Sequence, residues 1–236
     1  MTEDLGMLSA DRREQIGAWI AGIRPAYEKE GIGMYVTRRV GKIFQGLIHK
    51  YGTEGLKKRV WNWDYSRGHY GYGSSVGDFL YSFLLEHVHN GSILDLGCGE
   101  GKTANELDQD AYTQYVGVDI SDLAIAKARA WTEREGRRGK NMFYCSDVES
   151  FVPSRQFDVI LFRDSLYYLP QPKTTLDRYS TFLTQDGCFV VRLCEGTGRH
   201  APLLKTIEAN FSVTGKRFCE VDEGPVAIAF RPMRKA

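Results

Sequence analysis

The most restrictive feature of the sequence is a regular alternation of short apolar runs and helical segments after Asn90-Gly91. This alternation is typical of βαβ units, in which helices cover a mostly parallel sheet. We predict strands near Ile93–Leu96, Tyr115–Val118, Met142–Cys145, Val159–Phe162 and Phe189–Leu193. We predict the intervening helices at Thr103–Leu107, Asp122–Glu133, Thr174–Phe182 and Pro202–Ala209. The chain is therefore expected to be an α/β protein.

The C-terminal end of the sequence predicts a hairpin rather than another crossover. Between Phe211 and Phe230, two β-rich runs flank the segment Asp222-Glu-Gly-Pro225, which leaves no room for a helix. Strands joined by so short a connection must be antiparallel. We therefore expect an antiparallel strand at the end of the sheet.

The N-terminal part of the chain has a different pattern. From Ser9 to His49 apolar residues recur at helical spacing, which predicts a pair of helices. The segment Trp61–Tyr72 concentrates aromatic residues among glycines and suits a loop or lid. The first part of the chain is thus expected to be an attachment to the α/β core.

A helix start separates this attachment from the core. Ser75 and Asp78 form a capping-box pattern that predicts a helix through Leu85. We therefore divide the chain into an N-terminal helical cap with an aromatic lid, residues 1–78, and a core, residues 79–236.

The composition argues against several classes of function. Thirty-one Lys and Arg balance thirty Asp and Glu to give a net charge of +1, so global charge provides no basis for nucleic-acid binding. The five cysteines contain no C-x-x-C pair, so neither a metal nor a redox site is expected. The first residues are acidic, and no apolar run approaches the ~20 residues of a membrane span. We expect a cytoplasmic protein without a membrane segment.

A glycine-rich loop follows the first predicted strand, in Ile93-Leu-Asp-Leu-Gly-Cys-Gly-Glu-Gly-Lys-Thr103. A P-loop needs four residues between its first glycine and Gly-Lys-Thr, whereas Gly97 and Gly101 enclose only three. A dinucleotide fingerprint needs Gly or Ala where Lys102 stands. The loop can bring backbone close to a ligand, but it lacks the spacing that seats a pyrophosphate.

The segment Asp95-Leu-Gly-Cys-Gly-Glu-Gly101 resembles motif I of the class I methyltransferases, which use S-adenosylmethionine (AdoMet). AdoMet carries an α-ammonium and no pyrophosphate, so a carboxylate beside the loop suits it. The alternative is that Asp95 only orders the turn. The resemblance covers roughly residues 80–232. It implies a Rossmann-like, seven-stranded, mostly parallel sheet with an antiparallel C-terminal hairpin strand, and S-adenosylhomocysteine as the product.

Further positions match the same family. Val116-Gly-Val-Asp119 places an acid about 20 residues after the loop, where the resemblance implies contacts to both ribose hydroxyls. It also implies that Asp147 receives the adenine amino group and that Val148 offers a backbone N–H, although Asp147 alone is equally consistent with a turn or helix cap. The expected cofactor-binding residues are Asp95, Gly97, Cys98, Gly99, Gly101, Asp119, Ile120, Ser146, Asp147, Val148 and Arg163.

The end of the fourth predicted strand, up to Tyr168, matches family motif IV, which faces the methyl donor and the acceptor. Methyl transfer is an in-line displacement, so the protein chiefly aligns the reacting groups and excludes water. The catalytic candidates are Asp164, His69 and Tyr167. The sequence lacks the Asp/Asn-Pro-Pro-Tyr run, the Pro-Cys nucleophile and the metal-binding acidic cluster of other subclasses.

Acceptor-binding candidates come from three regions: the aromatic segment, the end of the motif IV region, and the end of the fifth predicted strand with the loop after it. Aromatic faces attract a sulfonium or amine, so the tyrosines of the aromatic segment are site candidates, and its tryptophans are expected in the core. The full set is Tyr65, Tyr70, Tyr72, Tyr168, Arg192, Glu195 and His200. The alternatives are a hydrophobic anchor for the aromatic segment, a surface histidine for His69 and a solvated charge for Arg192.

The residues favour a methyltransferase that modifies an O or N atom of a small molecule, such as a natural-product intermediate. The basic runs Lys57-Lys-Arg59 and Arg137-Arg-Gly-Lys140 support an alternative, an RNA or tRNA acceptor, although such short clusters are usually solvated faces. A non-catalytic AdoMet-binding domain is a second alternative, because sensor and catalyst both need the cofactor residues. No pattern in the sequence defines the acceptor or the oligomeric state.

Overall fold

The computed structural model describes residues 45–68, 79–194, 198–219 and 224–233 of the 236-residue chain. The chain divides into two compact units, residues 1–46 and 47–236, and the second contains nearly all the described residues. The helix pair predicted over Ser9–His49 lies largely outside them, although residues 47–51 are helical. The predicted capping box at Ser75 and Asp78 also lies outside, and the division after residue 78 stays a prediction.

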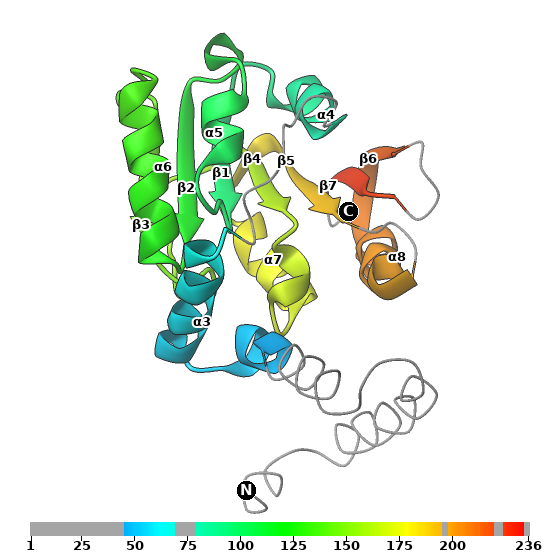
Figure 1. Ribbon diagram of the computed structural model, residues 1–236. Coiled ribbons are helices and arrows are strands. Elements are labelled where there is room, and N and C mark those ends of the chain that lie inside the picture. The colour runs from blue at the N-terminus through cyan, green and yellow to red at the C-terminus, as the bar shows by residue number, and fades with distance from the viewer. Residues whose placement is uncertain (1–44, 69–78, 195–197, 220–223, 234–236) are drawn as a thin grey trace, which may run out of the picture. The chain divides into compact units, whose positions relative to one another are not determined.

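The second unit is built on a seven-stranded sheet in the order β3-β2-β1-β4-β5-β7-β6 (Figure 1). Strands β1 to β5 are mutually parallel, and β7 is antiparallel to both β5 and β6. The strands are β1 Ser92–Leu96, β2 Gln114–Asp119, β3 Asn141–Cys145, β4 Phe157–Arg163, β5 Leu183–Leu193, β6 Phe211–Phe218 and β7 Val226–Pro232. The predicted mostly parallel Rossmann-like sheet with its antiparallel hairpin is confirmed. The antiparallel strand lies second from the edge, because the hairpin folds β7 back between β5 and β6.

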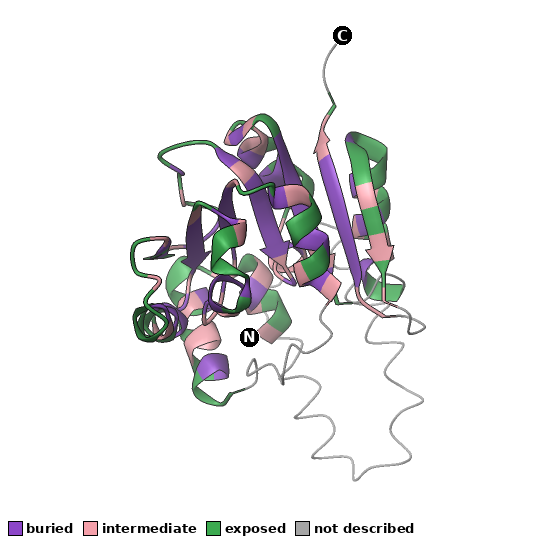
Figure 2. Cartoon of the chain, turned by 90° about the horizontal axis from the view of Figure 1, so that it is seen from above, coloured by how far each residue is buried: buried purple, intermediate pink, exposed green. Residues whose placement is uncertain are grey.

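Helices cover both faces of the sheet because the central strands are apolar on both sides (Figure 2). In β1, for example, Ile93 packs into one hydrophobic cluster and Leu94 into the other. The helices of the core are α4 Phe79–Val88, α5 Lys102–Glu106, α6 Asp122–Arg134, α7 Pro172–Ser180 and α8 Ala201–Asn210, with short 3-10 turns at Gln109–Ala111, Leu166–Tyr168 and Gly198–His200. Residues of α4, α5 and α6 pack into the cluster with Ile93, and residues of α7 and α8 pack into the cluster with Leu94.

Helix α3, Glu54–Ser66, contradicts the expectation of a loop for the first part of the aromatic segment, residues 61–66. The helix contains a single glycine, Gly55, in its first turn, and it ends before Gly68, whose φ is +69°. The glycines that suggested a loop therefore follow the helix instead of interrupting it. Figure 1 shows α3 beside the ends of the strands to which the β2 arrow points.

None of the helices in the described part of the chain is long and apolar enough to cross a membrane.

Candidate active site

The strand order places a topological switch point between β1 and β4. From β1 the chain proceeds toward β2, whereas from β4 it proceeds toward β5, on the other side. In open α/β sheets a ligand crevice forms outside the carboxyl ends of the strands at such a point. Two cavities open there, and they share Tyr65, Gly97 and Arg163 in their walls.

The glycine-rich loop is held tightly against the neighbouring strand end. The backbone N–H groups of Gly97 and Cys98 donate to the Val118 carbonyl at 2.8 and 3.0 Å. Gly97 has a φ of +85°, and a Cβ at this position would lie 2.4 Å from Cβ of Ser165. Only glycine fits this turn without displacing the loop that follows β4. The site thus needs glycine here for both its backbone conformation and its lack of a side chain.

Asp95, at the carboxyl end of β1, is almost completely buried in the wall of the first cavity. Its Oδ2 accepts a hydrogen bond from the hydroxyl of Tyr115, whereas Oδ1 has no hydrogen-bond partner within the described part of the chain. Burial raises the pKa of this carboxyl to about 7, although the hydrogen bond from Tyr115 and the charge of Arg163 act in the opposite direction. A buried oxygen without a partner suits a cationic hydrogen-bond donor.

Asp119, at the end of β2, is held by the backbone on both sides. Its Oδ2 accepts from Gly99 N, and its Oδ1 accepts from Ser121 N, both at 2.9 Å. Burial raises the pKa of this carboxyl to about 6, opposed by these hydrogen bonds and by one from Tyr65. The carboxylate is thereby oriented toward the second cavity, whose wall it forms with Ile120.

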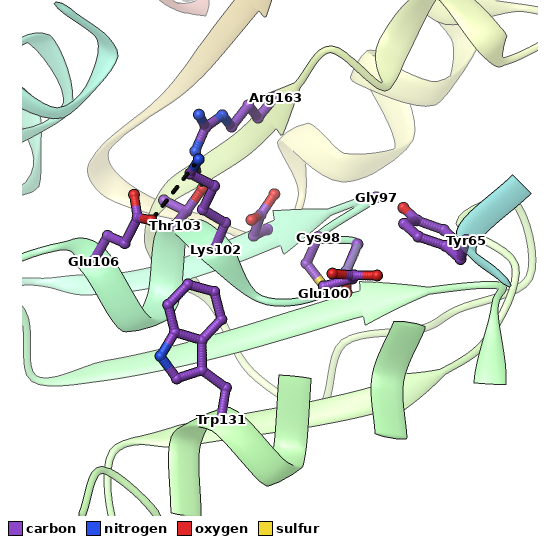
Figure 3. Close-up of a pocket in the computed structure, with 11 residues that line it drawn as sticks. Tyr65, Gly97, Cys98, Glu100, Lys102, Thr103, Glu106, Trp131 and Arg163 are labelled. Atoms are coloured by element: carbon purple, nitrogen blue, oxygen red, sulfur yellow. Dashed lines mark hydrogen bonds and ion pairs between the residues drawn. The ribbon is translucent and has the colours of Figure 1, made fainter. Parts of the chain in front are cut away.

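One face of α3 forms the opposite wall of the site. Lys57, Trp61 and Tyr65 follow one another at intervals of four residues, which places them on the same side of a helix. Tyr65 points toward the glycine-rich loop (Figure 3), and a Cβ at Gly99 would lie 2.8 Å from its hydroxyl. Helix α3 therefore spans the site from the glycine loop to the end of β3.

Lys57 is buried between two acids, which contradicts the interpretation of its basic run as a solvated face. Its Nζ lies 3.0 Å from Oδ2 of Asp147 and 2.6 Å from Oε2 of Glu149. Burial lowers the pKa of Lys57, but the hydrogen bonds and charges of Glu149 and Asp147 together outweigh burial, so the pKa is raised. Lys57 therefore carries its positive charge inside the site at neutral pH.

Lys58 and Asn62, which lie one turn apart on a neighbouring side of α3, attach the helix to the start of α6. Lys58 forms an ion pair with Asp122 at 2.8 Å, and the amide of Asn62 donates to the same carboxylate at 2.8 Å. The side-chain oxygen of Asn62 accepts from the hydroxyl of Ser121 at 2.6 Å. Ser121 also caps α6 by accepting from Ala124 N at 3.1 Å. The wall formed by α3 is thus held in place by polar contacts.

The end of β4 and the loop after it carry the groups expected to face a methyl donor. Arg163 donates to the hydroxyls of Tyr81 and Thr103 at 2.9 and 3.1 Å. It lines both cavities, and Figure 3 shows it in the first. Asp164 has a φ of +54°, a strained value for a residue with a side chain, and its carboxylate is paired with Arg192. Such strain is characteristic of functional positions. An anionic acceptor would have to share Arg192 with Asp164.

An aromatic and histidine cluster closes the far end of the second cavity. The ring of His49 stacks on Trp61 with a centroid distance of 4.0 Å, and Tyr168 meets both rings edge-on. His49 Nε2 lies 3.5 Å from Oδ2 of Asp64. Burial lowers the pKa of His49 to about 4, so the imidazole is neutral at pH 7.

Tyr167 contributes a protonated hydroxyl to the same cavity. Burial raises its pKa far above the usual value, and Asp164 adds to this effect. Its ring stacks on His200 at 4.1 Å, and its hydroxyl donates to Sγ of Cys194 at 3.6 Å. Tyr167 can therefore donate a hydrogen bond, whereas its phenolate form is strongly disfavoured.

The structure brings most of the expected site residues together. Asp95, Gly97, Cys98, Gly99 and Arg163 line the first cavity with Tyr65. Asp119, Ile120, Asp147, Val148, Asp164, Tyr167 and Tyr168 line the second. Gly101, Ser146, Arg192 and His200 are not among the lining residues, and His69, Tyr70, Tyr72 and Glu195 lie outside the described residues.

Sequence inspection missed Lys57, His49 and Trp61 as cavity residues. The expectation that the tryptophans of this segment pack in the core is wrong, because Trp63 is 49% exposed and Trp61 faces the cavity. The four-residue spacing of Lys57, Trp61 and Tyr65 is the signal that could have identified this face.

Comparison with known proteins identifies the family of this site. A family model described as "Methyltransferase domain" matches residues 87–224, more than half of the chain. The chain belongs to this family of AdoMet-using methyltransferases.

Two sequence relatives and one solved structure show how far the likeness extends. The chain is 26% identical to the sterol 24-C-methyltransferase erg6 of Aspergillus fumigatus, over 52% of this chain and 37% of that protein. It is 28% identical to the malonyl-[acyl-carrier protein] O-methyltransferase of Haemophilus influenzae, over 48% of this chain and 42% of that protein. The chain thus spans less than half the length of either relative. Magnesium protoporphyrin IX methyltransferase from Synechocystis PCC 6803 has the same fold, with a TM-score of 0.60, 17% identity, and coverage of 75% of this chain and 96% of that one.

Proposed function

We propose that the protein transfers the methyl group of AdoMet to an O or N atom of a small molecule. The observation that carries this proposal is the buried Oδ1 of Asp95, a residue that lines the first cavity, because this oxygen has no hydrogen-bond partner among the described residues. The α-ammonium of AdoMet supplies both the positive charge and the donor that this oxygen needs.

The other walls of the two cavities suit the remaining parts of AdoMet. Arg163, beside Asp95 in the first cavity, offers its guanidinium to the cofactor's carboxylate. Asp119 presents a fixed carboxylate to the ribose hydroxyls, and Asp147 with Val148 forms the place for adenine. We infer that the first cavity holds the amino-acid end and that the second holds the nucleoside end.

When bound, AdoMet supplies a methyl group that is activated by a positively charged sulfur. The residues of the chain have the simpler tasks of alignment and exclusion of water. Trp61, Tyr167 and Tyr168 form an aromatic wall around the acceptor end, and such faces favour a cationic or aromatic group.

The small-molecule acceptor is supported by the relatives and by the shape of the site. The names of the two relatives describe transfer to a carbon of a sterol and to an oxygen of malonyl-[acyl-carrier protein]. Besides the residues proposed for the nucleoside, the second cavity has an aromatic wall suited to an acceptor, and Asp164, whose carboxylate is paired with Arg192, also lines it. Assignment to an O or N atom, and the cytoplasmic location, stay predictions.

The alternative of an RNA acceptor loses support because three cations of its basic runs are engaged elsewhere. Lys57 and Lys58 are both paired with acids. In the second run, the Arg137 guanidinium donates to the carbonyls of Ala104 and Leu107 at 3.1 and 2.6 Å. Cations used in this way do not form a phosphate-binding surface.

One experiment separates the three functions. The protein is incubated with AdoMet labelled in its methyl group and with cell extract, a set of phenols, carboxylic acids and amines, or tRNA. We expect label in small-molecule products. Label in tRNA would support the RNA alternative, and calorimetric binding of AdoMet without transfer to any acceptor would support a non-catalytic domain.

A further inference from the structure

We propose that Lys57 of α3 positions the adenine ring by fixing the carboxylate of Asp147 as the acceptor for the 6-amino group. The inference rests on the proposed function, since it takes adenine to bind beside Asp147. It adds a residue outside the sheet to the cofactor site and assigns it a role in ligand specificity.

The carboxylate of Asp147 is held from two sides. Lys57 Nζ donates to Oδ2 at 3.0 Å, and the backbone N–H of Glu149 donates to Oδ1 at 3.0 Å. These two contacts fix both the position and the rotation of the carboxylate plane. A carboxylate has about four acceptor positions, so two remain for a ligand.

The charges around Lys57 favour a hydrogen-bond donor over a hydrogen-bond acceptor on the ligand group that binds beside Asp147. One ammonium stands between the two carboxylates of Asp147 and Glu149, which leaves one negative charge in excess. A 6-amino group directs hydrogens toward such a site, whereas the oxygen of a 6-oxo purine is repelled. The cluster should therefore distinguish adenine from hypoxanthine.

Helix α3 keeps Lys57 in place without help from the ligand. Its polar contacts to Ser121 and Asp122 anchor the next row of the helix to α6. Lys57 is 8% exposed, so its ammonium has little water to replace a lost acid partner. The opposite hypothesis is that Lys57 blocks Asp147 and must leave before adenine binds. On that hypothesis, replacing Lys57 would strengthen binding of the adenine ligand, whereas a positioning role predicts weaker binding.

The test measures binding of S-adenosylhomocysteine and S-inosylhomocysteine by isothermal titration calorimetry. These ligands differ in the 6-amino or 6-oxo group of the base. The variants are Lys57→Met, Lys57→Arg and the control Lys58→Met, which removes the neighbouring cation whose ion pair points to Asp122. Lys57→Gln replaces Lys57→Met if thermal unfolding shows that the latter is not folded.

We expect Lys57→Met to weaken S-adenosylhomocysteine binding by roughly tenfold, the size of one charged hydrogen-bond contact. Binding of S-inosylhomocysteine should change by less than about threefold. Lys57→Arg should restore most of the preference for the amino ligand. Lys58→Met should leave the ratio of the two affinities unchanged, because Asn62 still holds the helix to Ser121 and Asp122.

Equal losses for both ligands in Lys57→Met would overturn the positioning role, as would tighter binding of S-adenosylhomocysteine. A changed ratio in Lys58→Met would also overturn it, because the effect would then belong to the helix as a whole. If the unmodified protein binds neither ligand, the proposed function itself fails, which is a distinct result.

Discussion

Arg192, near the end of β5, holds the carboxylate of Asp164, whose own backbone lies in the left-handed region at the end of β4. The backbone N–H of Asp164 also donates to the Arg192 carbonyl at 3.0 Å. The two residues are thus joined by backbone and side chain, beside the cavity proposed for the acceptor.

The ion pair between these residues should be important for stability. We expect Arg192→Met to lower the free energy of unfolding by about 3–5 kcal/mol, because it removes the cation that is paired with the buried carboxylate of Asp164. Urea denaturation measures this change. The control is Lys173→Met, which breaks an exposed pair with Asp177 and should cost less than about 1 kcal/mol. Similar values for the two variants would contradict the prediction.

Cofactor affinity should increase with pH between about 5 and 8. Burial raises the pKa of Asp95 to about 7, and a bound α-ammonium lowers it again by favouring the carboxylate, so binding releases a proton. The affinity gain is therefore complete only above about pH 8, one unit above the pKa of the ligand-free carboxyl, and it is lost as the pH falls through 7. Calorimetry of S-adenosylhomocysteine binding in two buffers with different ionisation enthalpies measures the protons released. Proton uptake, or none, at pH 6 would contradict this role for Asp95.

The same carboxyl groups should make the ligand-free protein less stable as the pH rises. The folded-state pKa values of Asp95 and Asp119, about 7 and about 6, lie above the ordinary value, so the native state binds more protons between pH 4 and 7. Their contribution to stability is therefore present at low pH and lost as the pH rises through these values. Thermal unfolding of the double variant Asp95→Asn/Asp119→Asn should show a weaker decline over this range.

Removal of the ribose-facing acid should weaken binding without unfolding the protein. We expect Asp119→Ala to reduce S-adenosylhomocysteine affinity by about 1.5–3 kcal/mol, roughly ten- to a hundredfold. The control is Asp110→Ala in the exposed turn before β2, at the opposite edge of the sheet. Unchanged affinity in folded Asp119→Ala would refute the assignment.

The turn at Gly97 should not tolerate a side chain. A methyl group there would collide with Ser165 and occupy a backbone conformation with positive φ. We expect Gly97→Ala to destabilise the protein by at least about 1–3 kcal/mol and to impair cofactor binding. Gly139→Ala is the control, because a Cβ at that position meets nothing within 4 Å.

The sheet could be predicted from the sequence because its central strands bury both faces and its parallel strands end in or near polar residues. Asp95, Asp119 and Asp147 each follow an apolar run, and in a parallel sheet the ends of such runs lie on one edge. The strand order was therefore the only further information needed to predict that these three acids lie close together.

Helix α3 could not be predicted from hydrophobic periodicity because some of its charged residues are buried and some of its apolar residues are exposed. Lys57 and Asp64 are buried, whereas Leu56 and Trp63 are 43% and 49% exposed. These positions are determined by contacts to acids, to His49 and to α6, which only the folded chain brings together. The predicted lid over residues 61–73 stays a prediction, although its first part is helical.

The two ends of the site are linked by a fixed length of helix. Lys57 at the adenine end and Tyr65 at the glycine loop are eight residues apart, which corresponds to about 12 Å along a helix. An insertion or deletion of one residue between them would rotate one end by about 100° relative to the other and separate Lys57 from Asp147 or Tyr65 from the loop. Among variants of this chain, α3 should therefore accept substitutions on its exposed face but keep a constant length between these two residues.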